Sequence, residues 1–233
     1  MNKNPIIVAL DFESAGEARA LVRRLAGGIG FYKVGLELYT AAGPAVVKEL
    51  IAEGKEVFLD LKMYDIPETV RRATAVAATS GARFLTVHAV PSLLRAAVEG
   101  KAGSKLELLA VTVLTSFGRD DLADLGYSCE ASELVAARTR QAVAAGCEGI
   151  VTSPLEAAAV RAITGPGTII VTPGVRSRGS ARGDQKRVAT PAEAILQGAD
   201  YLVMGRQITR AADPAGEAAR VLEEIETATA AAR

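Results

Sequence analysis

The stretch LIAEGKEVFLDLK, residues 50–62, joins a helical run, a glycine and a short apolar strand. The same order recurs in AATSGARFLTVHA (77–89), AVAAGCEGIVTS (142–153) and AILQGADYLVMG (194–205). In each copy a glycine stands where the helix should end, because glycine adopts the left-handed conformation without a Cβ penalty. The four are Gly54, Gly81, Gly146 and Gly198. Each following strand is nearly continuous in hydrophobicity, which is typical of parallel strands buried on both faces.

Extended along the chain, this pattern predicts eight strands alternating with eight helices. The strands are expected near 6–11, 31–36, 56–62, 84–89, 107–114, 149–153, 168–173 and 201–205. The helices are expected near 14–26, 43–53, 67–80, 91–100, 132–145, 154–164, 190–198 and 214–229. Prolines fall at five helix starts, where a missing N–H costs little: Pro67, Pro91, Pro154, Pro191 and Pro214. This alternation predicts an α/β fold, a single (β/α)8 TIM barrel over residues 1–233. An open doubly wound sheet is the alternative, but no G-x-G-x-x-G follows the first strand.

The composition excludes several classes of protein. Of 233 residues, 27 are Lys or Arg and 27 are Asp or Glu, so no global charge favours nucleic acid or an anionic membrane. Cys129 and Cys147 lack a metal-binding spacing and suit a reducing compartment. The early apolar run PIIVAL is too short for a signal sequence or a membrane span. We expect a soluble cytoplasmic protein without a nucleic-acid or membrane partner.

A barrel of this kind carries its active site at the carboxyl ends of the strands. Polar residues that look out of place in the apolar strand pattern gather at those predicted ends: Asp11, Lys33, Asp60, Lys62, His88, Thr115, Ser116, Arg176 and Arg206. Their convergence at one end of the predicted barrel indicates a functional site more strongly than any of these residues does alone. His88 is the only histidine, and we expect it to be a hydrogen-bonded residue of the mouth rather than a general base.

The sequence DLKMYD (60–65) contains two carboxylates and an amine beside a buried strand. Strand alternation places Asp60 and Lys62 on one face, with Asp65 just beyond and Lys33 on the neighbouring strand. Three interpretations compete: a structural ion-pair cluster in which Asp65 caps a helix, a metal site, or a catalytic proton relay. Opposite charges would keep one another ionised, and the place at the barrel mouth favours the relay. Two ammonium groups disfavour a divalent cation there.

A second set of residues indicates a phosphate site. TPGVRSRGSARGDQKR (172–187) is rich in glycine and basic residues, and VMGRQI (203–208) places Gly205 and Arg206 at the end of the last strand. Loops after strands 7 and 8 of such barrels commonly bind phosphate through backbone N–H groups and arginines. A solvated basic loop is the alternative. Residues 176–187 are also long enough for a lid.

These motifs together resemble the orotidine 5′-phosphate decarboxylase family over nearly the whole chain. The matching stretches, in the family's order and spacing, are VALD (8–11), YKVG (32–35), DLKMYDIPETV (60–70), TVHA (86–89), VTVLTS (111–116), TPGVR (172–176), GDQKR (183–187) and MGR (204–206). The resemblance implies a homodimer, without metal or organic cofactor, that converts orotidine 5′-phosphate to uridine 5′-phosphate and carbon dioxide.

The resemblance also implies a role for each matching residue. Lys62 would donate the proton, Asp60 would lie against the departing carboxylate, and Lys33 would contact Asp60 and the ribose. Asp65, Ile66 and Thr69 would reach into the partner subunit's site. The remaining contacts are implied for ribose (Asp11), base (Thr115, Ser116 and Pro173) and phosphate (Arg176, Gln185, Gly205 and Arg206).

Two other functions stay open at this point. Relatives that act as keto-gulonate-phosphate decarboxylases or hexulose-phosphate synthases share D-x-K-x-x-D but use magnesium and an acidic residue on the second strand, where this chain has Lys33. A non-catalytic barrel that binds a nucleotide phosphate is the other alternative. It would not need Lys62 as a proton donor.

Overall fold

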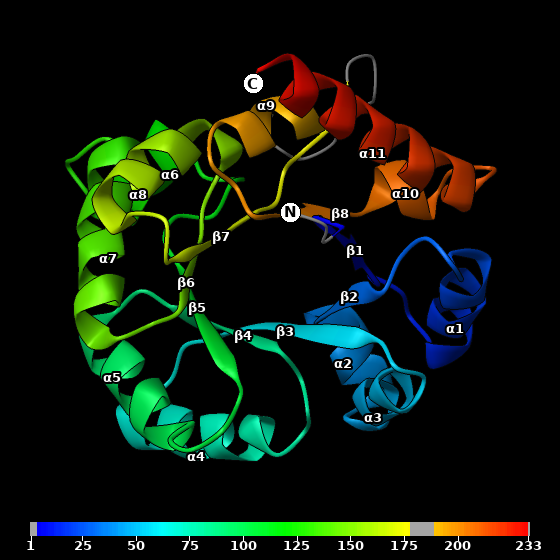
Figure 1. The fold of residues 1–233 in the computed structure, drawn as a ribbon. Helices are drawn as coiled ribbons and strands as arrows, with labels where there is room; N and C mark the ends of the chain where they lie inside the picture. Colours follow the sequence, from blue (N-terminus) through cyan, green and yellow to red (C-terminus); the bar gives the residue numbers. More distant parts are fainter. Residues whose placement is uncertain (1–3, 178–188, 233) are drawn as a thin grey trace.

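The chain folds as a ring of eight parallel strands inside a ring of helices, seen along the barrel in Figure 1. The computed structural model describes residues 4–177 and 189–232. The strands are β1 (Ile6–Ala9), β2 (Phe31–Gly35), β3 (Glu56–Met63), β4 (Phe84–His88), β5 (Glu107–Val111), β6 (Gly149–Val151), β7 (Ile169–Thr172) and β8 (Tyr201–Met204). They follow one another around the barrel in chain order, and β8 closes the ring by pairing with β1, with Ile6 beside Leu202. The prediction of a (β/α)8 barrel is confirmed.

The helices mostly lie where the periodicity predicts them. They are α1 (Ala15–Arg24), α2 (Leu36–Ala42), α3 (Ala45–Ala52), α4 (Pro67–Ala78), α5 (Pro91–Gly100), α6 (Arg119–Asp124), α7 (Ala131–Ala145), the 3-10 turn η1 (Pro154–Glu156), α8 (Ala157–Thr164), α9 (Pro191–Leu196), α10 (Arg206–Thr209) and α11 (Pro214–Ala231). All five prolines begin a helix or the 3-10 turn. The four glycines of the recurring motif have φ between 73° and 99°, which confirms their left-handed conformation.

Three short helices were not predicted: α2, α6 and α10. Each follows the carboxyl end of a strand, directly or after a loop, and so lies at the end of the barrel where the active site is expected. Their lengths of seven, six and four residues are too short for a helical period to stand out in the sequence. The predicted strand 107–114 is also too long, because β5 ends at Val111 and the chain enters a loop.

Two apolar layers stabilise the barrel. One fills the space between strands and helices and includes Val8, Leu85 and Leu202. The other fills the barrel interior and includes Phe31, Phe58 and Phe84. Together they bury most of the large apolar side chains, as the uninterrupted apolar strands predict.

The amino-terminal end of the barrel is closed by Arg83. Its guanidinium lies 4.7–5.5 Å from the ring centres of Phe31, Phe84 and Tyr201 and forms ion pairs of 3.0 Å with Glu56 and Glu107. Such an arrangement stabilises the barrel and leaves the opposite end for chemistry. Within the described ranges, every helix is too short or too polar to cross a bilayer.

Candidate active site

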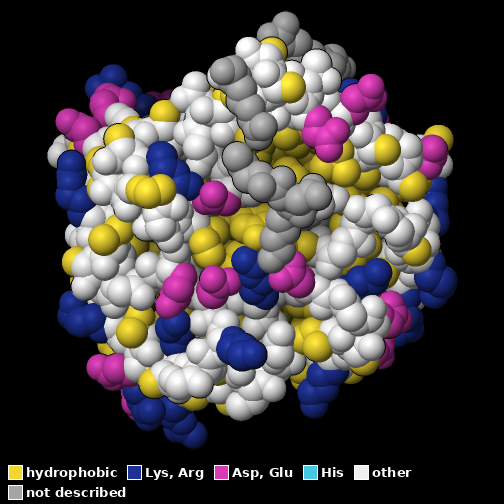
Figure 2. All heavy atoms as spheres, in the orientation of Figure 1, with side chains coloured by type: hydrophobic (Ala, Val, Ile, Leu, Met, Phe, Trp, Pro, Cys, Tyr) yellow, Lys and Arg dark blue, Asp and Glu magenta, His cyan; other side chains and the backbone are white. Residues whose placement is uncertain are grey.

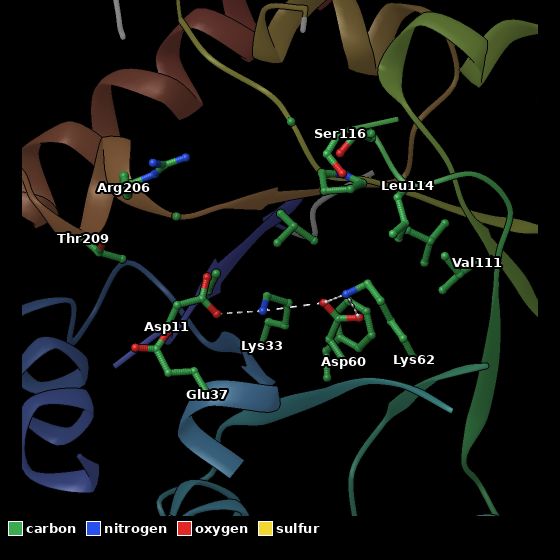
Figure 3. Close-up of a pocket in the computed structure, with 18 of the residues that line it drawn as sticks. Asp11, Lys33, Glu37, Asp60, Lys62, Val111, Leu114, Ser116, Arg206 and Thr209 are labelled. Carbon is green, nitrogen blue, oxygen red and sulfur yellow. Dashed lines mark hydrogen bonds and ion pairs between the residues drawn. The ribbon is translucent and has the colours of Figure 1, made fainter. Parts of the chain in front are cut away.

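Four charged residues form a row at the carboxyl ends of β1, β2 and β3 (Figure 3). Lys33 Nζ lies 2.9 Å from Asp11 Oδ1 and 3.5 Å from Asp60 Oδ2. Lys62 Nζ lies 2.8 Å from both carboxylate oxygens of Asp60. The row therefore alternates in charge, Asp11, Lys33, Asp60, Lys62, as the sequence predicts for its last three members.

In this row, burial and ion pairing shift the pKa values of Lys33 and Asp60 in opposite directions. Lys33 and Asp60 are only 8% and 9% exposed. Burial acts to raise the pKa of Asp60, but Lys33, Lys62 and the hydrogen bonds from Lys62 and Thr86 bring it below its ordinary value. Burial likewise acts to lower the pKa of Lys33, but Asp60 and Asp11 bring it above its ordinary value. Both groups are thus charged at neutral pH.

The backbone at Lys62 departs from a regular strand. Its φ is 45°, the one positive φ of a non-glycine residue in the described chain. The pairing of β3 with β4 shifts register between Leu59 and Met63, and Lys62 N–H donates to Thr86 Oγ1 at 2.9 Å. Thr86 Oγ1 in turn donates to Asp60 Oδ1 at 3.0 Å. The simple alternation used to predict the site therefore does not hold at Lys62, although its side chain does meet Asp60.

Gly35 provides space for the row. A Cβ on this residue would lie 2.7 Å from Lys33 Nζ and 3.3 Å from Asp11 Oδ1. Any other residue would therefore displace the Lys33 ammonium from between the carboxylates. The sequence motif YKVG contained this glycine, but nothing in its spacing indicated the contact.

The predicted base and phosphate residues line the same cavity as the charged row. Its volume is about 740 Å³, within the range usual for ligand pockets. Thr115, Ser116, Pro173, Arg176, Gly205 and Arg206 all belong to its wall. In Figure 3, Arg206 and Ser116 lie across the cavity from the row. Gln185 and most of the expected lid lie outside the described residues.

The cavity also contains residues that the sequence did not single out. Glu13, Glu17, Glu37, Thr209 and Arg210 line its mouth, and Phe58, Val111, Val151 and Val203 line its floor. The mouth residues come from α1, α2, α10 and the loops beside them, so only the three-dimensional arrangement brings them together. In Figure 2, acidic and basic side chains lie next to one another near the centre of the face shown.

Asp65, Ile66 and Thr69 lie outside this cavity and are exposed. Asp65 Oδ1 accepts a hydrogen bond from Ile66 N–H at 2.6 Å. Asp65 is not the N-cap of α4, because Ile66 occupies that position and makes no side-chain capping bond. Tyr64 and Ile66, on either side of Asp65, are 69% and 67% exposed.

His88 lies beside the cavity rather than in its wall. Its ring makes an edge-to-face contact with Tyr64, with ring centres 5.5 Å apart. Burial, then the cations Arg138 and Lys62, lower the pKa of His88 below its ordinary value. The imidazole is therefore neutral at pH 7.

Comparison with known proteins gives one consistent family. A protein from Rhodopseudomonas palustris named orotidine 5′-phosphate decarboxylase is 50% identical over 227 residues, covering 97% of each chain. One of the same name from Nitrobacter winogradskyi is 50% identical over 223 residues, covering 96% of this chain and 93% of the relative. The crystal structure of orotidine 5′-phosphate decarboxylase from Lactobacillus acidophilus superimposes with a TM-score of 0.84 at 34% identity, covering 96% of this chain and 99% of the other. Residues 4–221 match the family as a whole. The chain belongs to the orotidine 5′-phosphate decarboxylase / HUMPS family.

Proposed function

We propose that the chain removes the carboxylate of orotidine 5′-phosphate and yields uridine 5′-phosphate and carbon dioxide. The proposal rests above all on Lys62, whose ammonium contacts both oxygens of Asp60 at one side of a cavity with Arg176 and Arg206 in its wall. The family and the names of the relatives point to the same reaction. It is the last step in the synthesis of uridine 5′-phosphate.

In the proposed mechanism, the bond between the pyrimidine ring and its carboxylate breaks and carbon dioxide leaves. The electron pair stays on the ring carbon, which has no delocalising group for it. An adjacent fixed cation is then the main available stabiliser, and Lys62 provides it. Lys62 Nζ next donates a proton to the carbanion and is reprotonated from water. Asp60 would lie against the departing carboxylate and raise the energy of the bound substrate.

The other residues would bind and orient the substrate. Asp11 and Lys33 would contact the ribose, whereas Thr115, Ser116 and Pro173 would contact the base. Arg176, Gln185, Gly205 and Arg206 would bind the phosphate, with arginines providing paired N–H donors. Phosphate binding would supply remote binding energy that offsets the cost of ordering and desolvation at the reacting carbon.

We further propose that no metal takes part. The oxygens of Asp60 face two ammonium groups within 3.5 Å, and a divalent cation there would meet like charge. A magnesium-dependent relative would need an acidic residue at the position of Lys33. A purely binding barrel would not need Lys62 as a proton donor.

We also propose a cytoplasmic homodimer with active sites completed across the interface. Asp65, Ile66 and Thr69 would contact the partner subunit's site. Their exposure at the end of β3, with Tyr64 and Ile66 as apolar anchors, supports this arrangement.

The direct test is the loss of orotidine 5′-phosphate absorbance on adding metal-stripped protein in excess EDTA. We expect full activity, because the proposed stabilising charge is the Lys62 ammonium. Activity that returns only on adding magnesium would overturn the metal-free mechanism. No turnover with or without metal would overturn the reaction itself.

A further inference from the structure

Two polar residues stand directly after the two arginines of the cavity wall. Ser177 follows Arg176 in the loop after β7, and Gln207 follows Arg206 at the start of α10. Ser177 N–H donates to Gln207 Oε1 at 3.1 Å, and Gln207 Nε2 donates to Ser177 Oγ at 2.9 Å. Two hydrogen bonds to the Gln207 side chain thus join two distant segments, one residue away from each arginine.

This Ser177–Gln207 pair is connected to the long helix α11. Gln207 Nε2 donates to Glu217 Oε1 at 2.7 Å, and Ser177 Oγ donates to Glu224 Oε2 at 2.8 Å. Arg220 donates to both oxygens of Glu217, at 2.9 and 2.6 Å. The hydrogen bonds from Arg220, and to a lesser extent from Gln207, lower the pKa of Glu217, although burial opposes them. The acceptor therefore stays ionised at neutral pH.

Every polar atom of the Gln207 amide has a partner. Its oxygen accepts from Ser177 N–H, and its nitrogen donates to Ser177 Oγ and to Glu217. This arrangement defines one amide orientation. Ser177 is only 4% exposed, so its own hydrogen bonds lie away from bulk water. The pair therefore connects the loop after β7 to α10 and α11.

We propose that Ser177 and Gln207 are positioning residues that set the separation of Arg176 and Arg206 for a phosphate monoester. This inference rests on the proposed function, in which both arginines bind the substrate phosphate. Arginine binds phosphate with directional N–H bonds. The affinity for phosphate therefore depends on the positions of the two guanidinium groups before the ligand binds. Fixing their backbones before the ligand arrives lowers the ordering cost of binding.

The test compares Gln207→Ala with wild type for uridine 5′-phosphate and uridine, which differ only in the phosphate. Calorimetry or ligand NMR gives the two Kd values. We expect about tenfold weaker binding of the nucleotide, equivalent to about 1.4 kcal/mol, and less than a twofold change for uridine. KM for orotidine 5′-phosphate should rise more than kcat falls. Gln141→Ala, at an exposed position of α7, is the matched control and should change neither ligand.

Ser177→Ala is the second variant, useful also if Gln207→Ala does not fold. It should weaken nucleotide binding to a smaller degree, because the Ser177 N–H bond to Gln207 remains. The affinity of the double variant for the nucleotide should fall by about as much as that of Gln207→Ala alone, since both substitutions break the same connection. An equal loss of affinity for the nucleotide and for uridine, or no loss of affinity, would overturn the positioning role. A wild type that binds both ligands equally well would instead overturn the phosphate site of the proposed function.

Discussion

At the scale of single residues, Lys62 combines a strained backbone with a paired side chain. A positive φ costs a non-glycine residue of the order of 1–3 kcal/mol and persists only where neighbouring contacts impose it. Here Thr86 binds the Lys62 N–H and Asp60 binds the ammonium. The strain thus turns the side chain toward the cavity at a fixed distance from Asp60. Such outliers are frequent at active sites, which agrees with the proposed role of Lys62.

Replacing Lys62 by alanine tests that role. We expect kcat to fall by about 10,000-fold or more, because one change removes both the proton donor and the stabilising cation. Binding of uridine 5′-phosphate should persist, since the arginines are unchanged. Turnover assays and calorimetry on the same preparation measure both effects. Lys105→Ala, at an exposed position, is the control. Turnover within tenfold of wild type would remove Lys62 from the mechanism.

His88 allows an equally specific test of the site's electrostatics. As the only histidine, it gives one assignable imidazole signal in untagged protein. We expect an NMR titration midpoint below 6.5, because burial and the cations Arg138 and Lys62 lower its pKa. Above pH 7 both folded and unfolded forms are neutral, so stability does not depend on this group. As pH falls through 6.5, the unfolded form binds the proton first, and stability declines.

Arg138→Gln isolates the contribution of one of the two cations to the lowered pKa of His88. Removing the Arg138 cation should move the His88 midpoint upward, while the parts of the shift caused by burial and by Lys62 remain. A wild-type midpoint at or above 6.5 would contradict the assigned environment. An unchanged midpoint in the variant would leave burial and Lys62 as the causes of the shift.

At the scale of elements, the register shift between β3 and β4 shapes the site. Thr86 on β4 is fully buried and accepts from Lys62 N–H while donating to Asp60. Thr86→Val keeps the shape but leaves both groups without this partner, which should cost about 1–3 kcal/mol of unfolding free energy. We also expect kcat/KM to fall by about tenfold to a hundredfold, because a small misplacement of Lys62 affects the reaction strongly.

Thr112→Val is the matched control for this change. Thr112 is also buried, and its hydroxyl donates to Val151 O on the neighbouring strand at 3.0 Å. Denaturant unfolding should show a comparable loss of stability, whereas activity should stay near that of wild type. Equal losses of activity in the two variants would mean that Thr86 supports the barrel in general and not Lys62 in particular.

The elements also show what the sequence could predict. Strands and long helices were predictable because burial on both faces and glycine or proline boundaries leave clear patterns. The row Lys33, Asp60, Lys62 was predictable because parallel strands place their carboxyl ends together. The positive φ at Lys62 and the contact with Thr86 were not, since a register shift depends on the pairing with β4. Glu37 and the Ser177–Gln207 pair likewise depend on helices too short to leave a pattern.

At the scale of the whole molecule, one end of the barrel is closed and the other end opens into a cavity. Arg83 closes the amino-terminal end with aromatic rings and carboxylates, whereas charged residues at the other end face an open cavity. Asp65 and Ile66 are exposed and do not belong to the wall of that cavity. A surface placed in this way supports completion of the site by a second copy, in a symmetric dimer.

Mixing two inactive variants, Asp65→Ala and Lys62→Ala, tests this arrangement. If Asp65 acts in the partner's site, each heterodimer contains one site with both native residues. Statistical exchange makes half of the dimers heterodimers, so about a quarter of all sites should recover. Mixing Asp65→Ala with the Lys62→Ala, Asp65→Ala double variant is the control, because no native site can form. Native mass spectrometry reports the exchange. Proven heterodimers without activity above this control would place Asp65 in its own subunit's site or outside catalysis.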